Sequence, residues 1–202
     1  MSDAGQETRA KLLQTAVEML DDLPEKDVTA SEILRRTGIA RGSLYHFWSN
    51  IGELLEEAYI VRYSRNVAEG SKAIKNLLDK SNTKEEFFEG LAQITAVTQN
   101  PKRKSNRYER ARILGMAEKN HSFRKALGQV QQELTDTLTE QVMSAQSRGW
   151  VTRELDPRTI AVLIQAYTLG KVVDDVVENQ MNPDHWNQLI GLIVDKALVG
   201  EK

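Results

Sequence analysis

The feature that most constrains this fold is a helical hydrophobic period that very little interrupts. The chain of 202 residues contains only four prolines and 12 glycines, and the apolar residues between them recur at the spacing of one helix face. Alternating runs rich in β-branched residues, which would predict half-buried strands, are missing. The sequence therefore predicts an all-α fold.

Capping signals divide this pattern into about nine helices. Capping boxes, in which a hydroxyl and a carboxylate satisfy each other's backbone N–H groups, begin at Thr29 and Thr83. Asp156 and Asn182 each precede a proline, which favours the first position of a helix. Together with the periodicity, these signals predict helices over about 6–21, 30–36, 41–48, 51–78, 83–97, the basic segment after Pro101, 122–147, 157–178 and 183–199.

Composition excludes several classes of function. Because the chain has no cysteine, disulfide frameworks, zinc–thiolate sites, iron–sulfur clusters and thiol nucleophiles are ruled out. The three histidines, His46, His121 and His185, have no ligand spacing on a helix, so we expect neither a metal nor a cofactor. Paired carboxylates, a Ser–His pair and a Gly-rich phosphate loop do not stand out, so we expect no enzyme. Short apolar runs and a polar N-terminus predict a cytoplasmic protein that does not enter a membrane.

Positive charge gathers in two stretches, although the chain as a whole carries a net charge of −2. Residues 29–50 contain three arginines and one acid, and residues 101–125 contain nine basic residues and two acidic ones. The net charge of −2 argues against a uniformly basic surface for non-specific nucleic-acid binding. It does not argue against a local basic surface.

The first of these stretches has the pattern of a helix-turn-helix. Two short helices flank the turn Thr37-Gly38-Ile39, and a supporting helix precedes them. In such motifs the residues at the start of the second helix reach base edges, while hydroxyls and helix N-termini hold phosphates. The same pattern is also simply a way to pack three helices, and the pattern alone leaves both interpretations open.

The segment from Val28 to Trp48 resembles the signature of the tetracycline-repressor (TetR) family. The match is most specific at Gly38-Ile39 and at Arg41-Gly42-Ser43-Leu44-Tyr45-His46. The resemblance implies a dimeric regulator of transcription, usually a repressor, which a small-molecule inducer releases from a palindromic DNA operator. It assigns a helix-turn-helix DNA-binding domain to residues 1–50 and a larger helical domain for ligand binding and dimerisation to residues 51–202.

Carried over by position, the resemblance implies phosphate contacts from Ser31 and Tyr45, and contacts in the major groove from the start of the recognition helix. The full set of predicted DNA-binding residues is Thr29, Ser31, Arg41, Gly42, Ser43, Tyr45, His46 and Asn50. His46 is equally compatible with a solvated surface position, whereas Trp48 is predicted to lie in the core.

Two positions depart from the family pattern. Ile51 stands where the family usually has a lysine that contacts a phosphate, so that contact is either missing or supplied by Asn50. Ala40 stands where a capping Ser or Thr is usual, which costs about 1 kcal/mol at the start of the helix. The departure at Ile51 keeps open an alternative function, a helical module that binds a protein partner without sequence-specific DNA binding.

The resemblance also implies that some residues of the larger domain line a ligand cavity, although apolar residues at helical spacing are usually core. The candidates are Phe88, Tyr108, Arg112, Met116, His121, Phe123, Gln165, Tyr167 and Thr168. The basic segment 102–112 has three interpretations: attraction of an acidic inducer, contact with DNA phosphates, or a solvated face.

The last two predicted helices carry more apolar residues than one amphipathic face needs. Part of that surface is therefore expected to pack on a second copy of the chain. In the family, these two helices form the interface of a two-fold dimer, which fits an isologous contact. The resemblance thus implies a homodimer through the last two helices.

Overall fold

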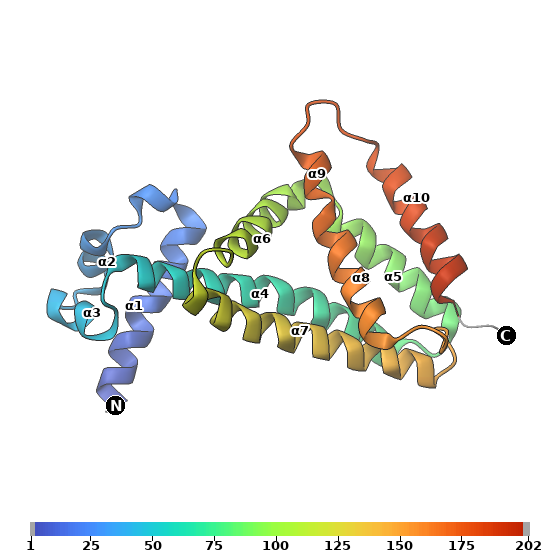
Figure 1. Cartoon of the computed structure of the whole chain (residues 1–202), viewed down its shortest axis with the longest axis horizontal. Coiled ribbons are helices and arrows are strands. Elements are labelled where there is room, and N and C mark those ends of the chain that lie inside the picture. Colours follow the sequence, from blue (N-terminus) through green and yellow to red (C-terminus); the bar gives the residue numbers. More distant parts are fainter. Residues whose placement is uncertain (1–2, 200–202) are drawn as a thin grey trace.

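The computed structural model of the protein describes residues 3–199, and every regular element in that range is helical (Figure 1). One isolated bridge joins Val151 to Val199. The α-helices are α1 (Asp3–Asp22), α2 (Ala30–Thr37), α3 (Arg41–Phe47), α4 (Ile51–Lys80), α5 (Lys84–Thr98), α6 (Lys104–Met116), α7 (His121–Ser147), α8 (Pro157–Gly170), α9 (Val172–Asp175) and α10 (Pro183–Ile193). Counted with the single turn of α9 as a continuation of α8, these are the nine predicted helices, and the all-α fold is confirmed.

Two of the predicted helices differ from the structure. The helix expected over 157–178 is interrupted at Lys171, between α8 and α9. The helix expected over 183–199 ends as an α-helix at Ile193 and continues as one π-helical turn, Val194–Leu198. No helix in the described residues is both long and apolar enough to cross a bilayer.

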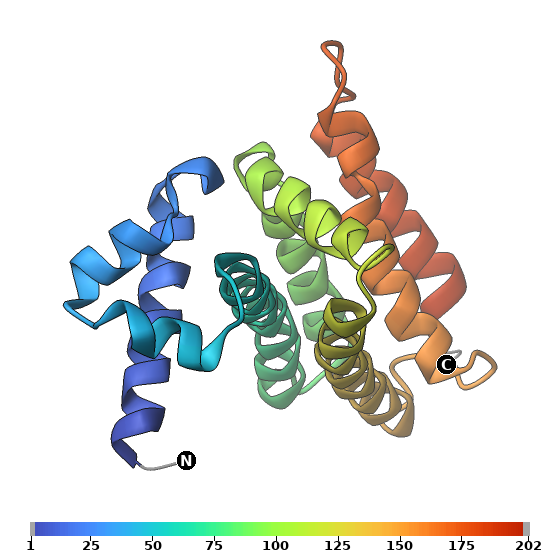
Figure 2. The same cartoon turned by 60° about the vertical axis from the view of Figure 1, so that its left-hand side comes forward.

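The first three helices form a cluster at one end of α4 (Figures 1 and 2). Its core is built from apolar residues of all four helices, including Leu12, Ala16, Ile33, Leu44 and Leu54, each of which is fully buried. The turn between α2 and α3 depends on Gly38, whose φ of 69° is left-handed and closes the end of α2. The predicted three-helix arrangement is thus present, with α4 as its fourth wall.

The other helices are built around α4 and α7, which pack side by side along much of their length. Helices α5, α6 and α8 lie on one side of this pair, and α10 packs against α5 (Figure 2). A second, smaller core under the far end of α4 includes Leu78, Phe87, Val142, Ile160 and Leu198. Helix α4 therefore runs from the N-terminal cluster into the larger bundle without a break.

The helix starts follow the capping signals, but each of the two predicted capping boxes forms only in part. The Thr83 hydroxyl accepts from Glu86 N at 3.2 Å, while the Glu86 carboxylate accepts from Asn82 N. Asp156 and Asn182 accept backbone hydrogen bonds from Thr159 and Asp184, at 2.7 and 2.9 Å. The Thr29 hydroxyl accepts one from Glu32 N at 3.3 Å. The Glu32 carboxylate, however, accepts from Arg35 and Arg36 instead of returning to Thr29, so only half of that capping box forms. These arginines lower the pKa of Glu32 to about 2.

Replacing Gly38 with alanine tests the left-handed turn. A Cβ there would meet nothing within 4 Å, so the cost is purely that of the backbone conformation, about 1 kcal/mol or more. We expect Gly38→Ala to lower the free energy of unfolding in urea by that amount. Gly128→Ala is the matched control, because Gly128 is exposed inside α7 with equally open space around it. There, the helix propensity of alanine adds up to about 1 kcal/mol of stability. Equal effects at the two positions would contradict this account.

Candidate DNA interface and ligand cavity

Helix α3 exposes the residues that were predicted to contact DNA. Leu44 is fully buried against α1 and α2, which turns Arg41, Gly42, Tyr45 and His46 toward the outside. The guanidinium of Arg41 lies 5.5 Å from the centre of the Tyr45 ring, a cation–π distance. Ser43 is half-buried. The start of α3 therefore presents a cation, an aromatic hydroxyl and an imidazole, with a glycine that leaves room for close approach.

The other predicted DNA residues lie at the starts of helices. Ser31 is exposed in the first turn of α2, and Thr29 caps that helix. Asn50 caps α4 through a hydrogen bond from Glu53 N to its Oδ1, at 3.1 Å. A Cβ on Gly52 would lie 2.9 Å from that oxygen, which explains the glycine beside the cap.

Two residues near this surface have structural roles. Ile51 is half-buried and packs against the N-terminal core, so it cannot supply the contact of the lysine it replaces. Trp48 is 4% exposed, as predicted for a core residue. Its indole N–H donates to Glu57 at 2.9 Å, and the guanidinium of Arg9 lies 4.9 Å from its ring centre. Trp48 thus joins the end of α3 to α1 and α4.

Residues 12–58, which include this surface, match the family model described as bacterial regulatory proteins of the tetR family. Residues 12–58 therefore form a DNA-binding domain of the TetR family. Proteins with this domain are DNA-binding regulators of transcription and not enzymes. The expected recognition helix is α3, at the exposed end of the molecule. Among curated proteins, none matches this sequence.

Solved structures of other regulators share the fold over the whole length of the chain. A TetR transcriptional regulator from Chloroflexus aurantiacus is 18% identical, with a TM-score of 0.64 over 99% of this chain and 100% of that one. A transcriptional regulator from Saccharomonospora viridis, in complex with choline, is 17% identical, with a TM-score of 0.64 over 97% and 100%. NemR of E. coli, in its reduced form, is 15% identical, with a TM-score of 0.60 over 96% and 100%.

The larger bundle contains a cavity of about 780 Å³. Its walls come from α4, α5, α6, α7, α8 and α10, and they are mostly apolar. The volume lies within the range of pockets that take a small organic molecule, about 300–1,000 Å³. Leu163, Leu189 and Ile193, on α8 and α10, line the cavity and are 43%, 49% and 40% exposed, so the cavity is open to solvent beside these residues. Val97 of α5 also lines it and is 57% exposed.

Three of the nine ligand-binding candidates line this cavity: Gln165, Tyr167 and Thr168. The other six lie elsewhere. Phe123 and Met116 pack in or against the N-terminal core, and Phe88 packs against the smaller one. Tyr108 donates to the backbone oxygen of Asp175 at 2.8 Å, Arg112 pairs with Glu25 at 2.9 Å, and His121 is exposed at the start of α7.

The polar residues of the cavity that were not among the candidates include Asn66, Arg107, Arg110 and Trp186. The two arginines belong to the basic segment 102–112, for which the sequence left open an acidic inducer, DNA phosphates and solvent as partners. In the structure this segment divides. Arg107 and Arg110 face the cavity, whereas Arg112 lies on the outside.

A buried ion pair stands at one side of the cavity. Arg107 donates to both carboxylate oxygens of Asp175, at 2.5 and 2.8 Å, and both side chains are 3% exposed. Arg107 also donates to the backbone oxygens of Thr98 and Asn100. Lys171, at the break between α8 and α9, donates to Gln99 O at 2.6 Å. These two cations satisfy the carbonyl groups at the end of α5 and so tie α5, α6 and α8 together.

The surroundings of Asp175 and Lys171 shift the pKa of each of these two side chains. Hydrogen bonds from Arg107 lower the pKa of Asp175 below its usual value of 3.8. Burial is the main cause that lowers the pKa of Lys171, with repulsion from Arg107 adding to it. Asp175 therefore stays ionised at neutral pH.

Removing the carboxylate of Asp175 leaves Arg107 buried without a counter-charge. We expect Asp175→Asn to lower the free energy of unfolding by about 3 kcal/mol at pH 7, measured by urea denaturation. The difference from the wild type should shrink as pH falls through the lowered native pKa, because the wild-type carboxyl then also becomes neutral. Asp79→Asn is the control. Its ion pair with Lys75 is about half exposed, so its loss changes stability by less than about 1 kcal/mol. Equal losses would show that the buried pair has no special role.

Proposed function

We propose that this chain represses transcription as a homodimer on a palindromic operator, and that a small molecule in the cavity releases it. The observation that carries this proposal is the continuity of α4. Its first turns contribute Leu54 to the core of the helix-turn-helix, and its second half, from Asn66 to Lys80, lines the cavity. One helix thus belongs to both the DNA-binding cluster and the ligand cavity.

We assign DNA binding to residues 1–50, with the larger domain over 51–202. The contacts in the major groove come from Arg41, Gly42, Ser43 and His46 on α3. Phosphate contacts come from Tyr45 and from the helix starts at Thr29, Ser31 and Asn50. A regulator that acts on chromosomal DNA works in the cytoplasm of a bacterium.

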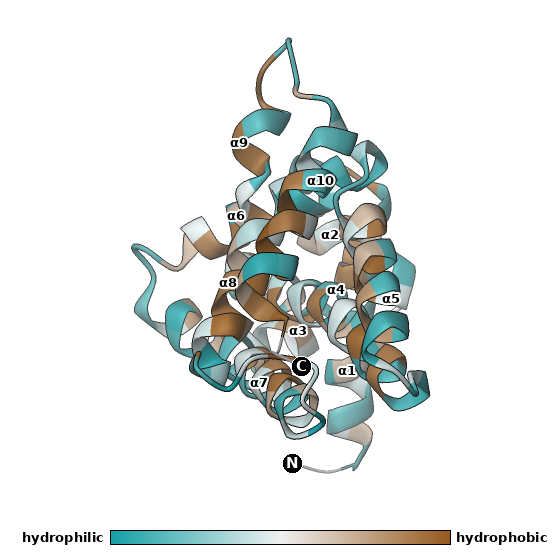
Figure 3. Ribbon diagram, turned by 90° about the vertical axis from the view of Figure 1, so that its right-hand side faces the viewer, coloured by the Kyte–Doolittle hydropathy of each residue, from teal (hydrophilic) through white to brown (hydrophobic). Residues whose placement is uncertain are grey.

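The dimer is assigned to α8, α9 and α10. Four large apolar residues on these helices are between 49% and 74% exposed: Val162, Val173, Leu189 and Leu192. Val176 and Val177, directly after α9, are 65% and 45% exposed. Figure 3 shows apolar segments of these helices on one side of the molecule. Exposed apolar surface gathered in this way marks an interaction site. A two-fold contact through it would carry two α3 helices to two half-sites of one operator.

The release by a small molecule rests on the cavity and on one structural neighbour. The protein from Saccharomonospora viridis was solved in complex with choline, so a protein with this fold holds a small molecule. A ligand that binds one spacing of the two α3 helices better than another shifts the population toward that spacing. Repression is then lost when the favoured spacing does not match the operator.

DNA binding is tested by selecting bound sequences from a random duplex pool at low salt. We expect a palindrome to be enriched. Arg41→Ala should weaken binding to that palindrome by about 1–3 kcal/mol, because it removes a base or phosphate contact, and should leave dimerisation unchanged. Lys75→Ala, which removes a cation far along α4, should bind as the wild type does. A folded, dimeric protein that enriches no sequence would contradict the proposal and favour a module that binds a protein partner.

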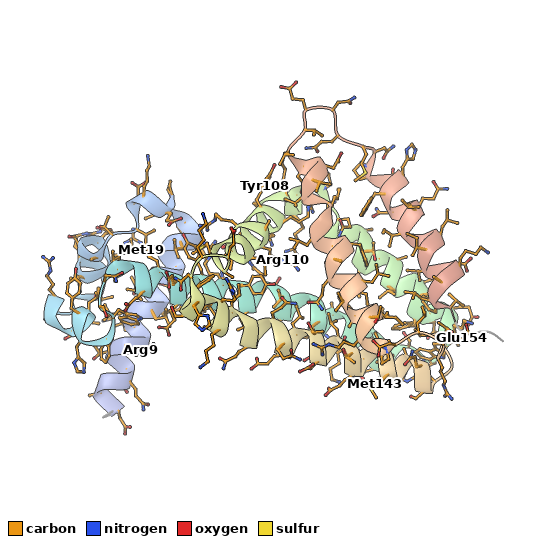
Figure 4. The ribbon with its side chains drawn as sticks, in the orientation of Figure 1. Arg9, Met19, Tyr108, Arg110, Met143 and Glu154 are labelled. Carbon is orange, nitrogen blue, oxygen red and sulfur yellow. The ribbon has the colours of Figure 1, made fainter. Side chains whose placement is uncertain are left out.

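The dimer is tested by placing a charge in its expected centre. We expect Leu192→Asp to sediment as a monomer at micromolar concentration, because the carboxylate would be desolvated in the interface. Met143→Asp is the control. Met143 is as exposed as Leu192, at 54% against 53%, but it lies on α7, away from α10 (Figure 4). A wild-type protein that is monomeric under these conditions would rule out the dimer.

A further inference from the structure

The lining of the cavity carries more positive than negative charge. Its charged residues are four basic ones, Lys80, Arg103, Arg107 and Arg110, and one acidic one, Glu69. Glu69 has a side chain that is 65% exposed and lies 3.9 Å from Arg103, at the rim. Asp175 neutralises Arg107 from behind the wall. Arg110 has no ion pair with any residue between 3 and 199.

Arg110 extends from α6 on the side that faces α8 (Figure 4). Its Nε atom is buried and has no hydrogen-bond partner in the described structure. The neighbouring acid, Glu109, is turned away and pairs with Arg62 at 2.8 Å. The hydroxyl of Tyr63 donates to Gln131 at 2.6 Å and hydrogen-bonds with the guanidinium of Arg110. Burial raises the pKa of Tyr63, and Arg110 offsets part of that rise. Arg110 is therefore a cation at an apolar cavity with an unused donor.

A second donor is also unused. The indole Nε1 of Trp186, which lines the cavity from α10, is buried without a partner. Buried donors are nearly always paired in folded proteins, so each such atom needs an explanation. Two unpartnered donors, one of them charged, favour a ligand that carries hydrogen-bond acceptors and negative charge.

Apart from uncharged polar residues such as Asn66, Gln165 and Thr168, the rest of the wall is apolar. Its apolar residues include Ile74, Leu77, Leu91, Ile94, Leu134 and Leu138. These side chains offer no polar group to a ligand. They match a hydrocarbon body that is removed from water when it enters. The charged and the apolar atoms of the cavity thus complement two parts of one ligand, an anionic group and a hydrocarbon body.

We infer that the ligand of this cavity is an acidic amphiphile, whose anionic group is held by Arg110 and whose hydrocarbon body fills the space between α4, α5, α7 and α8. A carboxylate would accept a charge-assisted hydrogen bond from the guanidinium of Arg110, whose Nε has no partner. A cation such as the choline bound by the Saccharomonospora viridis protein would meet like charge here instead. The inference rests on the proposed role of the cavity as a ligand site.

The test compares head groups on the same hydrocarbon chains. Octanoate, dodecanoate and hexadecanoate are titrated into the purified full chain by calorimetry below their micelle concentrations, each beside the alcohol and the trimethylammonium salt of equal length. We expect at least one acid to bind about tenfold or more tightly than its alcohol, because of the charge-assisted bond. The trimethylammonium salt should bind more weakly than the alcohol.

Variants on α6 identify the residue responsible. Arg110→Gln should bring the acid to the affinity of its alcohol and leave the alcohol unchanged, whereas Arg110→Lys should retain part of the preference. Arg112→Gln is the matched control, because Arg112 is two residues away on the outside of the same helix, and it should keep the wild-type preference for the acid over the alcohol. Circular dichroism checks that each variant is folded.

Either of two results would overturn the inference: no preference for any of the acids in the wild type, including no binding at all, or a preference that survives in Arg110→Gln. Release of the selected palindrome by the bound acid is measured separately. If the acid binds through Arg110 and does not release DNA, the proposed induction fails and the ligand class stands. If only neutral or cationic compounds bind and release DNA, induction stands and the ligand class fails.

Discussion

The structure depends above all on the packing of one face of helix α4, which is buried at intervals from Leu54 to Leu78. Helix α4 is covered by α1 at its start and by α7 beyond it, and Leu54, Ala58, Tyr59 and Tyr63 are at most 1% exposed. A 30-residue helix is stable in water only with such packing on its apolar face. The same helix closes the core of the helix-turn-helix and lines the cavity, so the two units share α4 as a common boundary. A displacement of α4 must therefore change both.

Two ion-pairing residues connect helix α6 to the DNA-binding cluster, Glu109 and Arg112. Both lie within two residues of Arg110, the proposed ligand contact. Arg62 of α4 pairs with Asp21 of α1 and with Glu109 of α6, and Arg112 pairs with Glu25 in the segment before α2. Glu109 precedes Arg110 directly. If an anion held by Arg110 shifts α6, the ion pairs to α1 and to Glu25 have to rearrange with it. The coupling is then a difference in contacts between two arrangements, which is the physical requirement for allosteric release.

The sequence predicted what is decided locally and missed what is decided by distant neighbours. Helix starts depend on one side chain and a backbone N–H three residues away, so Asp156 was a sufficient signal. Lys171, at the break between α8 and α9, donates to Gln99 O at the end of α5, a contact that no local pattern contains. Helical spacing likewise placed Phe123 on an inward face but did not distinguish a packed interior from a hollow one. In the basic segment, residues of the same type point in opposite directions, and only the fold separates Arg110 from Arg112.

The mouth of the cavity and the proposed dimer surface share residues, and this connects ligand binding to assembly. Leu163, Leu189 and Ile193 line the cavity and are exposed beside the apolar surface of α8 and α10. A second subunit packed on that surface would cover the opening and remove the same three side chains from water. A ligand that spreads α8 from α10 would disturb the contact between subunits, whereas one that lies fully inside would leave it intact. By reciprocity, dimerisation then changes the affinity for the ligand by the same factor as the ligand changes dimerisation.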